Sequence, residues 1–314
     1  MLDLRKGDCL ELMKDIPNGS VDMVLCDLPY GMTQNEKDVR LPFSPLWKEY
    51  NRVTKENAAI LLFGQGGFYV DLVNSNRKLF RYDLVWDKKL TTGFLNAKRM
   101  PLRQHEQIAV FYKKLPTFNP QFSCGKPLHS RGHSYMGKTL VNENYGEFRP
   151  MPDERRGSTQ KYPTSILRYP KPHPSVAKHQ TEKPIDLLEW LIRTYTNPND
   201  VVLDNCMGSG ATGVACVHTG RSFIGMELDA GYFNVSKKRI EEVATAQKGG
   251  CALTKEEAVK TIEVAIAEVE WEYPMEYATE MRGQLEMIEG IPGNEYDLDR
   301  LRELAQASQE ADHG

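Results

Sequence analysis

The sequence predicts an α/β fold, in which a sheet carries helices on both faces, with a loop-rich insert and an acidic helical tail. Three observations lead to this prediction. Short apolar runs alternate with amphipathic segments in residues 1–112 and again in residues 184–243, as is typical of a sheet covered by helices. Residues 115–178 contain nine prolines, a density that excludes long helices and central strands. Acidic side chains are concentrated after residue 250.

Four strands and one helix are expected in the first part of the chain. Apolar runs at residues 21–26, 58–63, 82–86 and 107–112 predict the strands. The run at 58–63 is continuous, which is typical of a strand buried on both faces. Residues 46–53 predict a helix between the first two strands.

The alternation resumes after the insert. Pro184 suits the first turn of a helix through residues 187–192. A strand is expected at 201–204, a helix at 211–217, a strand at 222–227 and a helix at 232–243. Gly249-Gly250 is the expected linker to the tail. There, residues 254–257 fit a capping box, residues 259–269 an amphipathic helix and residues 298–304 a second short helix.

The charge of the chain is unevenly distributed. The 314 residues include 40 basic and 43 acidic side chains, for a net charge of -3, which argues against a polyanionic partner only if the charge is evenly spread. Residues 1–250 carry +8, residues 251–314 carry -11, and residues 115–178 alone carry +6. The basic body indicates either a polyanion-binding surface or a solvated face.

Several classes of protein are excluded by composition. No apolar run approaches the roughly 18 residues of a membrane span, and the start of the chain lacks the apolar core of a secretion signal. The six cysteines show no C-x-x-C spacing and no zinc-ligand pattern with histidine. We therefore expect a cytoplasmic protein with reduced thiols, no metal and no membrane partner.

A glycine motif follows the strand expected at 201–204. Residues 204–213 contain G-x-G-x-x-G at the start of a helix, and Glu227 ends the next strand. Glycines let a ligand approach the backbone, and an acid so placed can accept hydrogen bonds from ribose hydroxyls. The motif predicts a nucleoside cofactor, either a dinucleotide or S-adenosylmethionine. Only one strand–helix unit follows it before the tail, so the sheet is permuted relative to the dinucleotide-binding Rossmann arrangement.

A second motif, Asp27-Leu28-Pro29-Tyr30, follows the strand expected at 21–26. A carboxylate and a backbone carbonyl can accept hydrogen bonds from an exocyclic amine, and proline fixes the direction of that carbonyl. A tyrosine ring offers a face for a flipped base. The alternative is an ordinary turn, with Tyr30 in the core.

This tetrapeptide resembles the D-P-P-Y loop of the DNA amino-methyltransferases, with Leu28 in place of the first proline. The order of catalytic loop, variable module and glycine loop is similar to that of the family's beta group. Residues 7–10 with 20–22, 84–88, 105–108 and the H-x-T-x-K-P run at 179–184 resemble further family segments. The resemblance covers residues 1–245 apart from 115–178. It implies a permuted Rossmann-like methyltransferase sheet and S-adenosylmethionine as the cofactor, although Cys206-Met207 departs from the family's usual aromatic residue.

The resemblance also implies roles for individual residues. Asp27 and the carbonyl of Leu28 would hold the amino group of a flipped adenine, with Pro29 fixing the loop and Tyr30 stacked on the base. The residues that it assigns to the cofactor are Asp8 at the adenine, Lys183 at the methionine carboxylate, Glu227 at the ribose, and Asp204, Gly208, Ser209 and Gly210 in the glycine loop.

Four segments are expected: a catalytic half at 1–114, a target-recognition insert at 115–178, a cofactor-binding half at 179–248 and the acidic helical tail at 249–314. Basic side chains of the insert are candidates for contacts with phosphates or guanine edges. They are Arg131, Arg149, Arg155, Arg156, Lys161 and Arg168.

The expected function is methylation of adenine N6 in double-stranded DNA, as in restriction-modification systems. The resemblance raises a homodimer and a cognate restriction nuclease as partners, and the sequence decides neither. An N4-cytosine methyltransferase is the nearest competing function, although a serine often heads the loop in that group. The sequence is also compatible with an NAD-dependent oxidoreductase that uses the glycine loop, with a non-catalytic DNA-binding module, and with RNA as the substrate.

Overall fold

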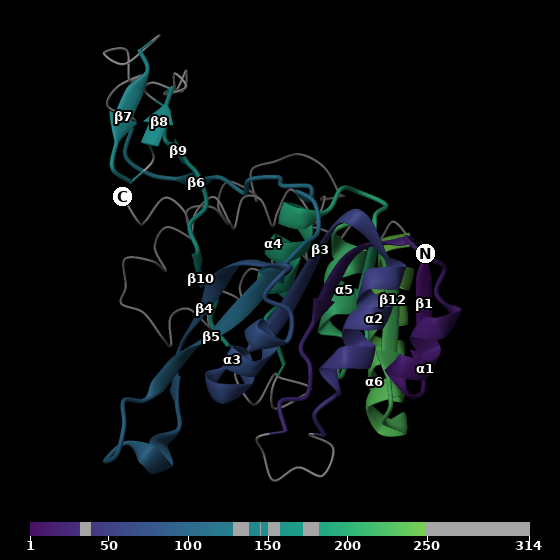
Figure 1. Ribbon diagram of the computed structural model, residues 1–314. Coiled ribbons are helices and arrows are strands. Elements are labelled where there is room, and N and C mark those ends of the chain that lie inside the picture. Colours follow the sequence, from purple (N-terminus) through teal and green to yellow (C-terminus); the bar gives the residue numbers. More distant parts are fainter. Residues whose placement is uncertain (32–38, 128–137, 145, 150–157, 172–181, 249–314) are drawn as a thin grey trace, which may run out of the picture. The chain divides into compact units, whose positions relative to one another are not determined.

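The computed structural model describes residues 1–31, 39–127, 138–144, 146–149, 158–171 and 182–248 (Figure 1). The chain separates into two units. Unit 1 consists of residues 1–121 and 164–249, and unit 2 of residues 122–163 and 250–314. Every residue of the large sheet and of the helices belongs to unit 1 among the described residues.

An eight-stranded sheet forms the centre of unit 1, in the order β1-β12-β11-β2-β3-β5-β4-β10. Its strands are β1 (Leu2–Lys6), β2 (Val21–Cys26), β3 (Thr54–Gly64), β4 (Phe80–Thr92), β5 (Arg103–Phe111), β10 (Ile166–Arg168), β11 (Val201–Asp204) and β12 (Ser222–Glu227). Neighbouring strands are parallel except at β5, which is antiparallel to both β3 and β4. The carboxyl ends of the other strands therefore share one edge of the sheet.

Helices cover both faces of this sheet. On one face lie α1 (Cys9–Leu12), the short 3-10 helix η1 (Met13–Asp15), α2 (Phe43–Val53) and α3 (Gly66–Ser75), and on the other lie α4 (Ile185–Tyr195), α5 (Ala211–His218) and α6 (Ala230–Lys248). In β2, Val24 and Cys26 pack in the first core, whereas Met23 and Leu25 pack in the second. This alternation follows from the two-residue period of a strand.

The expected α/β fold with helices on both faces is confirmed, and every strand and helix predicted within residues 21–243 is present. Strands β1 and β10 and helices α1 and α3 were not predicted. Charges interrupt the apolar pattern of Leu2–Lys6, two glycines open α3, and nearby prolines obscure β10. The predicted helices of the tail lie outside the described residues.

The predicted insert, residues 115–178, is divided between the two units. Residues 115–121 and the described residues 164–171 belong to unit 1, where β10 pairs with β4 at the edge of the large sheet. In unit 2, β6 (Ser123–Cys124) pairs with β9 (Gln160–Lys161), and β7 (Leu140–Asn142) pairs with β8 (Gly146–Phe148). These strands are short, as expected where prolines are frequent.

Candidate active site

The two predicted motifs lie on adjacent strands at the carboxyl edge of the sheet. Strand β2 leads into Asp27 and pairs directly with β11, which leads into the glycine loop. The order of strands along the chain reverses between β11 and β2. Open α/β sheets bind ligands at such a switch point, so the fold places both motifs where a ligand site is expected.

Both carboxylate oxygens of Asp27 are engaged. The hydroxyl of Tyr30 donates to Oδ1 at 2.8 Å, and Nζ of Lys183 donates to Oδ2 at 2.6 Å. The ring of Tyr30 stacks on that of Phe68, with centroids 4.6 Å apart and planes inclined by 22°. Leu28 is buried in the same core as Phe68. The loop is thus held by one ion pair, one hydrogen bond and one aromatic stack.

Lys183 belongs to a buried chain of alternating charges. Its Nζ lies 3.3 Å from Oε2 of Glu106, and Oε1 of Glu106 lies 3.3 Å from Nζ of Lys88. Nζ of Lys183 also lies 5.0 Å from the ring centroid of Phe63, within the range of a cation–π interaction. Each buried charge has an opposite neighbour, which offsets the cost of removing it from water.

The same buried row of charges sets the pKa values of Asp27, Glu106 and Lys183. Burial raises the pKa of Asp27, and the ammonium of Lys183 opposes that rise. Burial by itself would raise the pKa of Glu106, but Lys183 and Lys88 hold it below its usual value. Burial by itself would lower the pKa of Lys183, but the carboxylates of Asp27 and Glu106 raise it. Lys183 is therefore a cation at neutral pH, directly against the predicted catalytic carboxylate.

The glycine loop, residues 205–210, forms a cradle between β11 and α5. Gly208 has a φ of +50° and donates its N–H to Oε2 of Glu227 at 3.0 Å. A Cβ at Gly208 would meet no atom within 4 Å, so the space beside its backbone is open. Asp8, at the carboxyl end of β1, caps α1 through the N–H of Leu10 at 2.8 Å. Open backbone flanked by acids fits a nucleoside ligand.

Asp204 lies beneath this loop. It is buried, and its oxygens accept from the N–H of Cys206 at 3.1 Å and the hydroxyl of Thr212 at 2.7 Å. Burial raises the pKa of Asp204 to about 6. Asp204 thus joins the glycine loop to the first turn of α5, and it shapes the turn that precedes Gly208.

Sequence reasoning missed several residues around the site. Nη1 of Arg239 lies 3.3 Å from the carbonyl oxygen of Ser209, and its Nη2 pairs with Glu182 at 2.6 Å. This pair joins α6, the glycine loop and the segment before α4. Glu106 and Lys88 lie in segments that resemble the family, so the sequence indicated that these segments matter but assigned no role to either residue. Phe68 carried no sequence signal, since its contact with Tyr30 depends on the packing of α3.

The basic residues predicted to contact DNA are not all in one unit. Arg149, whose Nε donates to Oγ1 of Thr139 at 3.2 Å, and Lys161 lie in unit 2. Arg168 lies on β10 in unit 1. Arg131, Arg155 and Arg156 lie outside the described residues. Their role in DNA binding stays a prediction.

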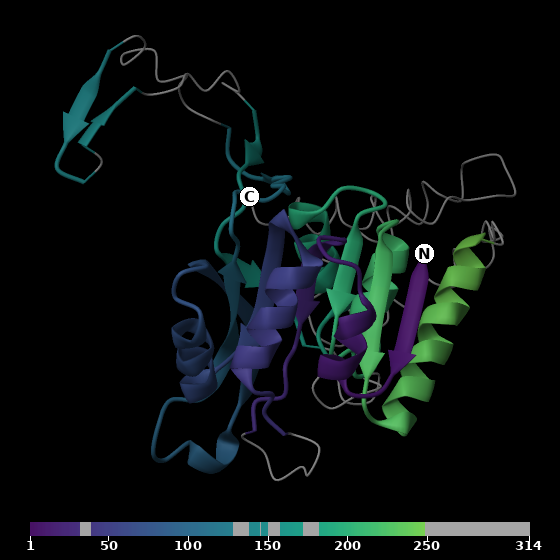
Figure 2. The same cartoon turned by 45° about the vertical axis from the view of Figure 1, so that its right-hand side comes forward.

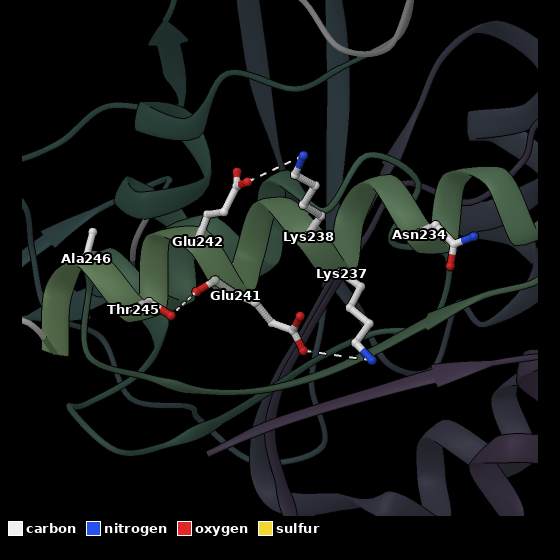
Figure 3. Close-up of a pocket in the computed structure, with 7 residues that line it drawn as sticks. All are labelled: Asn234, Lys237, Lys238, Glu241, Glu242, Thr245 and Ala246. Carbon is white, nitrogen blue, oxygen red and sulfur yellow. Dashed lines mark hydrogen bonds and ion pairs between the residues drawn. The ribbon is translucent and has the colours of Figure 1, made fainter.

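A hollow on the outer side of α6 is unrelated to these motifs. It is lined by Asn234, Lys237, Lys238, Glu241, Glu242, Thr245 and Ala246 (Figure 3). Two ion pairs, each between residues four positions apart, lie in it. The sequence predicted no functional role for any of its lining residues. Among the described residues, no cluster of His, Cys, Asp and Glu could hold a metal ion. No helix in the described part of the chain is long and apolar enough to cross a membrane.

Comparison with known proteins decides the family. Residues 21–238 match the model of the N6_N4 DNA methylases. The chain belongs to the N6_N4 DNA methylase family. This methylase is 34% identical over 265 residues to the type II methyltransferase M2.LlaDCHI of Lactococcus lactis subsp. cremoris, covering 76% of the chain and 89% of the relative. It is 26% identical over 257 residues to the DNA adenine methyltransferase YhdJ of Escherichia coli K12, covering 75% and 81%.

A solved structure supports the same conclusion. The complex of M1.HpyAVI with SAM superposes on this methylase with a TM-score of 0.51 and 25% sequence identity, covering 76% of this chain and 99% of the other. The predicted family and enzyme class, a DNA methyltransferase, are confirmed. The family rules out an NAD-dependent oxidoreductase.

Proposed function

We propose that this methyltransferase transfers a methyl group from S-adenosylmethionine to the N6 amine of an adenine flipped out of double-stranded DNA. The observation that carries the proposal is the position of Asp27, which follows β2 beside the glycine loop and has one oxygen fixed by Lys183. An aspartate at this position favours adenine over cytosine, whose methyltransferases often have serine there.

The residues at the carboxyl edge fit the methyl donor. S-adenosylmethionine supplies a methyl group on a sulfonium when it is bound. The open backbone at Gly208 would accommodate it, Glu227 would accept hydrogen bonds from its ribose, and Asp8 would reach its adenine. Ser209 and Gly210 complete the loop, and Asp204 supports it from below.

Asp27 binds the amine by exchanging one partner. Its Oδ1 releases the hydroxyl of Tyr30 and accepts an N–H of the target amine, while Oδ2 remains on Lys183. The carbonyl of Leu28 accepts the other N–H, and Pro29 fixes its direction. With both N–H groups held, the lone pair of the nitrogen would face the methyl group of the donor. The N–C bond would form as the S–C bond breaks, the thioether would leave with the sulfonium's electron pair, and the surplus proton of the amine would pass to Asp27 or to solvent, so that transfer depends on positioning and electrostatics.

Lys183 can serve both this role and the predicted contact with the methionine carboxylate. An ammonium has three N–H donors. One donates to Asp27 at 2.6 Å, and the ammonium also lies 3.3 Å from Oε2 of Glu106. A remaining N–H would bind a carboxylate of the methyl donor, so one side chain would connect the donor to the carboxylate that holds the acceptor.

The test combines sequencing with one variant and one control. Methylation-sensitive sequencing of DNA from cells that express the native chain should show methyladenine at a defined sequence. Asp27→Ala should bind S-adenosylmethionine in calorimetry but methylate nothing. Glu56→Ala is the control, because Glu56 is exposed at the start of β3, at the opposite edge of the sheet, and it should keep full activity.

Two outcomes would contradict the proposal. Full activity of Asp27→Ala would remove the assigned mechanism. N4-methylcytosine in mass analysis of the nucleosides would establish the second candidate, which the family model covers together with adenine N6.

The segments keep their proposed roles within this function. Residues 1–114 would supply catalysis, 179–248 the cofactor site, and 115–178 the contacts with DNA, in a homodimer that works beside a restriction nuclease. Arg155→Gln with Arg156→Gln should weaken DNA binding. The slope of log K against log salt concentration should become shallower by about 0.9 per lost phosphate contact. Unchanged affinity and slope would exclude these two side chains from the interface.

A further inference from the structure

Strands β4 and β5 continue beyond the sheet as a hairpin arm, residues 89–102. Thr92 pairs with Arg103 near the end of the ladder, and the 3-10 helix η2 (Phe94–Asn96) follows at the tip. The N–H groups of Asn96 and Met100 bond to the carbonyls of Gly93 and Asn96. Figures 1 and 2 show the arm (blue) extending from the lower end of the sheet, which is the carboxyl edge.

Large apolar side chains cover this arm. The exposed ones are Leu90 at 47%, Phe94 at 78%, Leu95 at 82%, Met100 at 56% and Leu102 at 40% of full exposure. Neither core of the described sheet and helices includes any of them. A contiguous set of exposed apolar side chains indicates an interaction site, so we expect a binding partner to cover the arm.

The charge of the arm identifies the partner. Residues 89–104 contain Lys89, Lys98, Arg99 and Arg103 and no acidic residue, for a net charge of +4. Cations that flank apolar side chains fit nucleic acid, in which phosphates surround stacked bases. A contact between the arms of two copies across a twofold axis would place one +4 arm against the other, and like charges would oppose that contact.

The arm starts beside the catalytic residues. Lys88, at its base, ends the buried charge chain that runs through Glu106 and Lys183 to Asp27. Strand β4 is three strands from β2, or about 14 Å at the usual spacing. The six residues from Lys88 to Phe94 can reach roughly 20 Å, beyond the roughly 8.5 Å depth of the major groove.

A local irregularity redirects the arm at its base. The register of β4 and β5 shifts between Asp87 and Thr92. Within that shift Lys89 has a φ of +50°, which is unusual for a residue other than glycine, and its N–H bonds to Oδ1 of Asp87 at 3.0 Å. Such bulges bend a strand and are frequent beside active sites.

We propose that the β4–β5 arm is a wedge that enters the DNA duplex beside the target base and occupies the space that the flipped base leaves. Phe94 and Leu95 at the tip enter between the bases, and Lys98 and Arg99 contact the flanking phosphates. This inference rests on the proposed function, since it assumes a base flipped out of duplex DNA, and it adds the element that stabilises the flipped state.

The test is the double variant Phe94→Ala/Leu95→Ala, assayed on a duplex that carries the site found by methylation sequencing. We expect kcat/KM to fall at least tenfold on the paired duplex. Activity should recover to within about threefold of native when the target adenine lies opposite an abasic position, because an unpaired base costs less to extrude. With 2-aminopurine in place of the target adenine, the native enzyme should raise the fluorescence and the variant should not.

Two further variants make the comparison specific. Val235→Ala removes a side chain that is 43% exposed on α6, a helix that packs on β12 and β1 at the other end of the strand order from β4, and it should behave as native on both duplexes. Lys98→Gln/Arg99→Gln should still flip the base in saturated complexes. The slope of log K for DNA binding against log salt concentration should become shallower by about 1.8, at about 0.9 per phosphate.

Each contrary outcome is distinct. Native rates for Phe94→Ala/Leu95→Ala on the paired duplex, or an equal loss on both duplexes, would overturn the wedge. A shift from dimer to monomer in sedimentation caused by this variant would assign the arm to a contact between copies and overturn it as well. If the native enzyme methylates no DNA, both the proposed function and the wedge are wrong. If the native enzyme is active and the variant is unaffected, only the wedge is wrong.

Discussion

At the scale of single residues, Asp27, the proposed catalytic carboxylate, pairs with a lysine that lies 156 positions further along the chain. Lys183 neutralises Asp27, and burial works against that effect by favouring the protonated acid. Only the ionised form of Asp27 can accept an N–H at Oδ1 while Oδ2 stays on Lys183. The pH at which activity appears therefore reports this ion pair.

Lys183→Met removes the cation while keeping much of the volume. The pKa of Asp27 should then rise further, because burial is no longer opposed by the ammonium. The acidic limb of the kcat profile should move to higher pH by the same amount, and Lys183→Arg should keep the native position. An unchanged limb together with a raised KM for S-adenosylmethionine would mean that Lys183 acts on the donor alone.

Asp204 provides a test through stability. Its pKa in the folded protein is about 6, above the ordinary value of 3.8, so the fold favours the protonated form. The free energy of unfolding should fall as the pH rises from about 4 to about 6, and Asp204→Asn, which stays neutral, should lack this loss. The free energy of unfolding in urea should differ between the variant and the native protein by an amount that changes by roughly 3 kcal/mol across that pH window. A constant difference would show that Asp204 is ionised throughout.

At the scale of elements, the contact between α5 and α6 depends on a small residue. A Cβ on Gly213 would lie 2.4 Å from Cδ1 of Ile240 on α6 and 2.8 Å from Cε1 of Phe223 on β12. The two helices and the strand therefore approach one another as closely as a glycine permits. Because α5 begins directly after the glycine loop, this contact also fixes the position of the cofactor cradle.

Gly213→Ala should destabilise the protein by about 1–2 kcal/mol, since overpacking costs more than the improved helix propensity returns. Gly67→Ala is the matched control in α3, where a Cβ would meet nothing within 4 Å. It should be neutral or stabilise by up to about 1 kcal/mol. Urea denaturation measures both, and equal effects would show that the α5–α6 contact can relax.

Sequence patterns predicted the elements whose burial is strong and regular. The run at 58–63 and the motif at 204–213 each identified a strand or turn, because their apolar or glycine patterns are local. Strand β1 escaped prediction because its burial is only partial and its partner β12 lies more than 200 residues away. The antiparallel position of β5 depends on pairing between strands, which no local pattern encodes.

The site was predictable to the same extent. Asp27, Tyr30 and the glycine loop follow strands and carry recognisable motifs. The contacts of Lys183 with Asp27 and Glu106 join residues from three distant segments, so spacing alone could not reveal them. The stack of Tyr30 on Phe68 depends in the same way on how α3 packs against the sheet.

At the scale of the whole molecule, the charge difference between body and tail remains the most prominent feature. Residues 1–250 carry +8 and residues 251–314 carry -11. Among the described residues, both cores of unit 1 consist of residues before position 249. An acidic segment tethered to a DNA-binding body competes with DNA for its basic surface.

Removal of residues 250–314 should therefore tighten non-specific DNA binding at low salt. The gain should shrink as salt rises, because screening weakens the competition between the tail and DNA. Fluorescence anisotropy with a duplex that lacks the recognition site measures both effects at several salt concentrations. Equal affinities for the truncated and full chains at low salt would exclude this function of the tail.

The ion pair between Asp27 and Lys183 makes the enzyme divisible. One charge is encoded before the segment at 122–163 and the other after it, so neither half of the chain would contain both members of the proposed catalytic pair. Two separately produced halves would each be silent, and methylation would begin only when they meet. Cut within residues 122–163, this protein should act as a reporter that methylates DNA only where two fused partners associate.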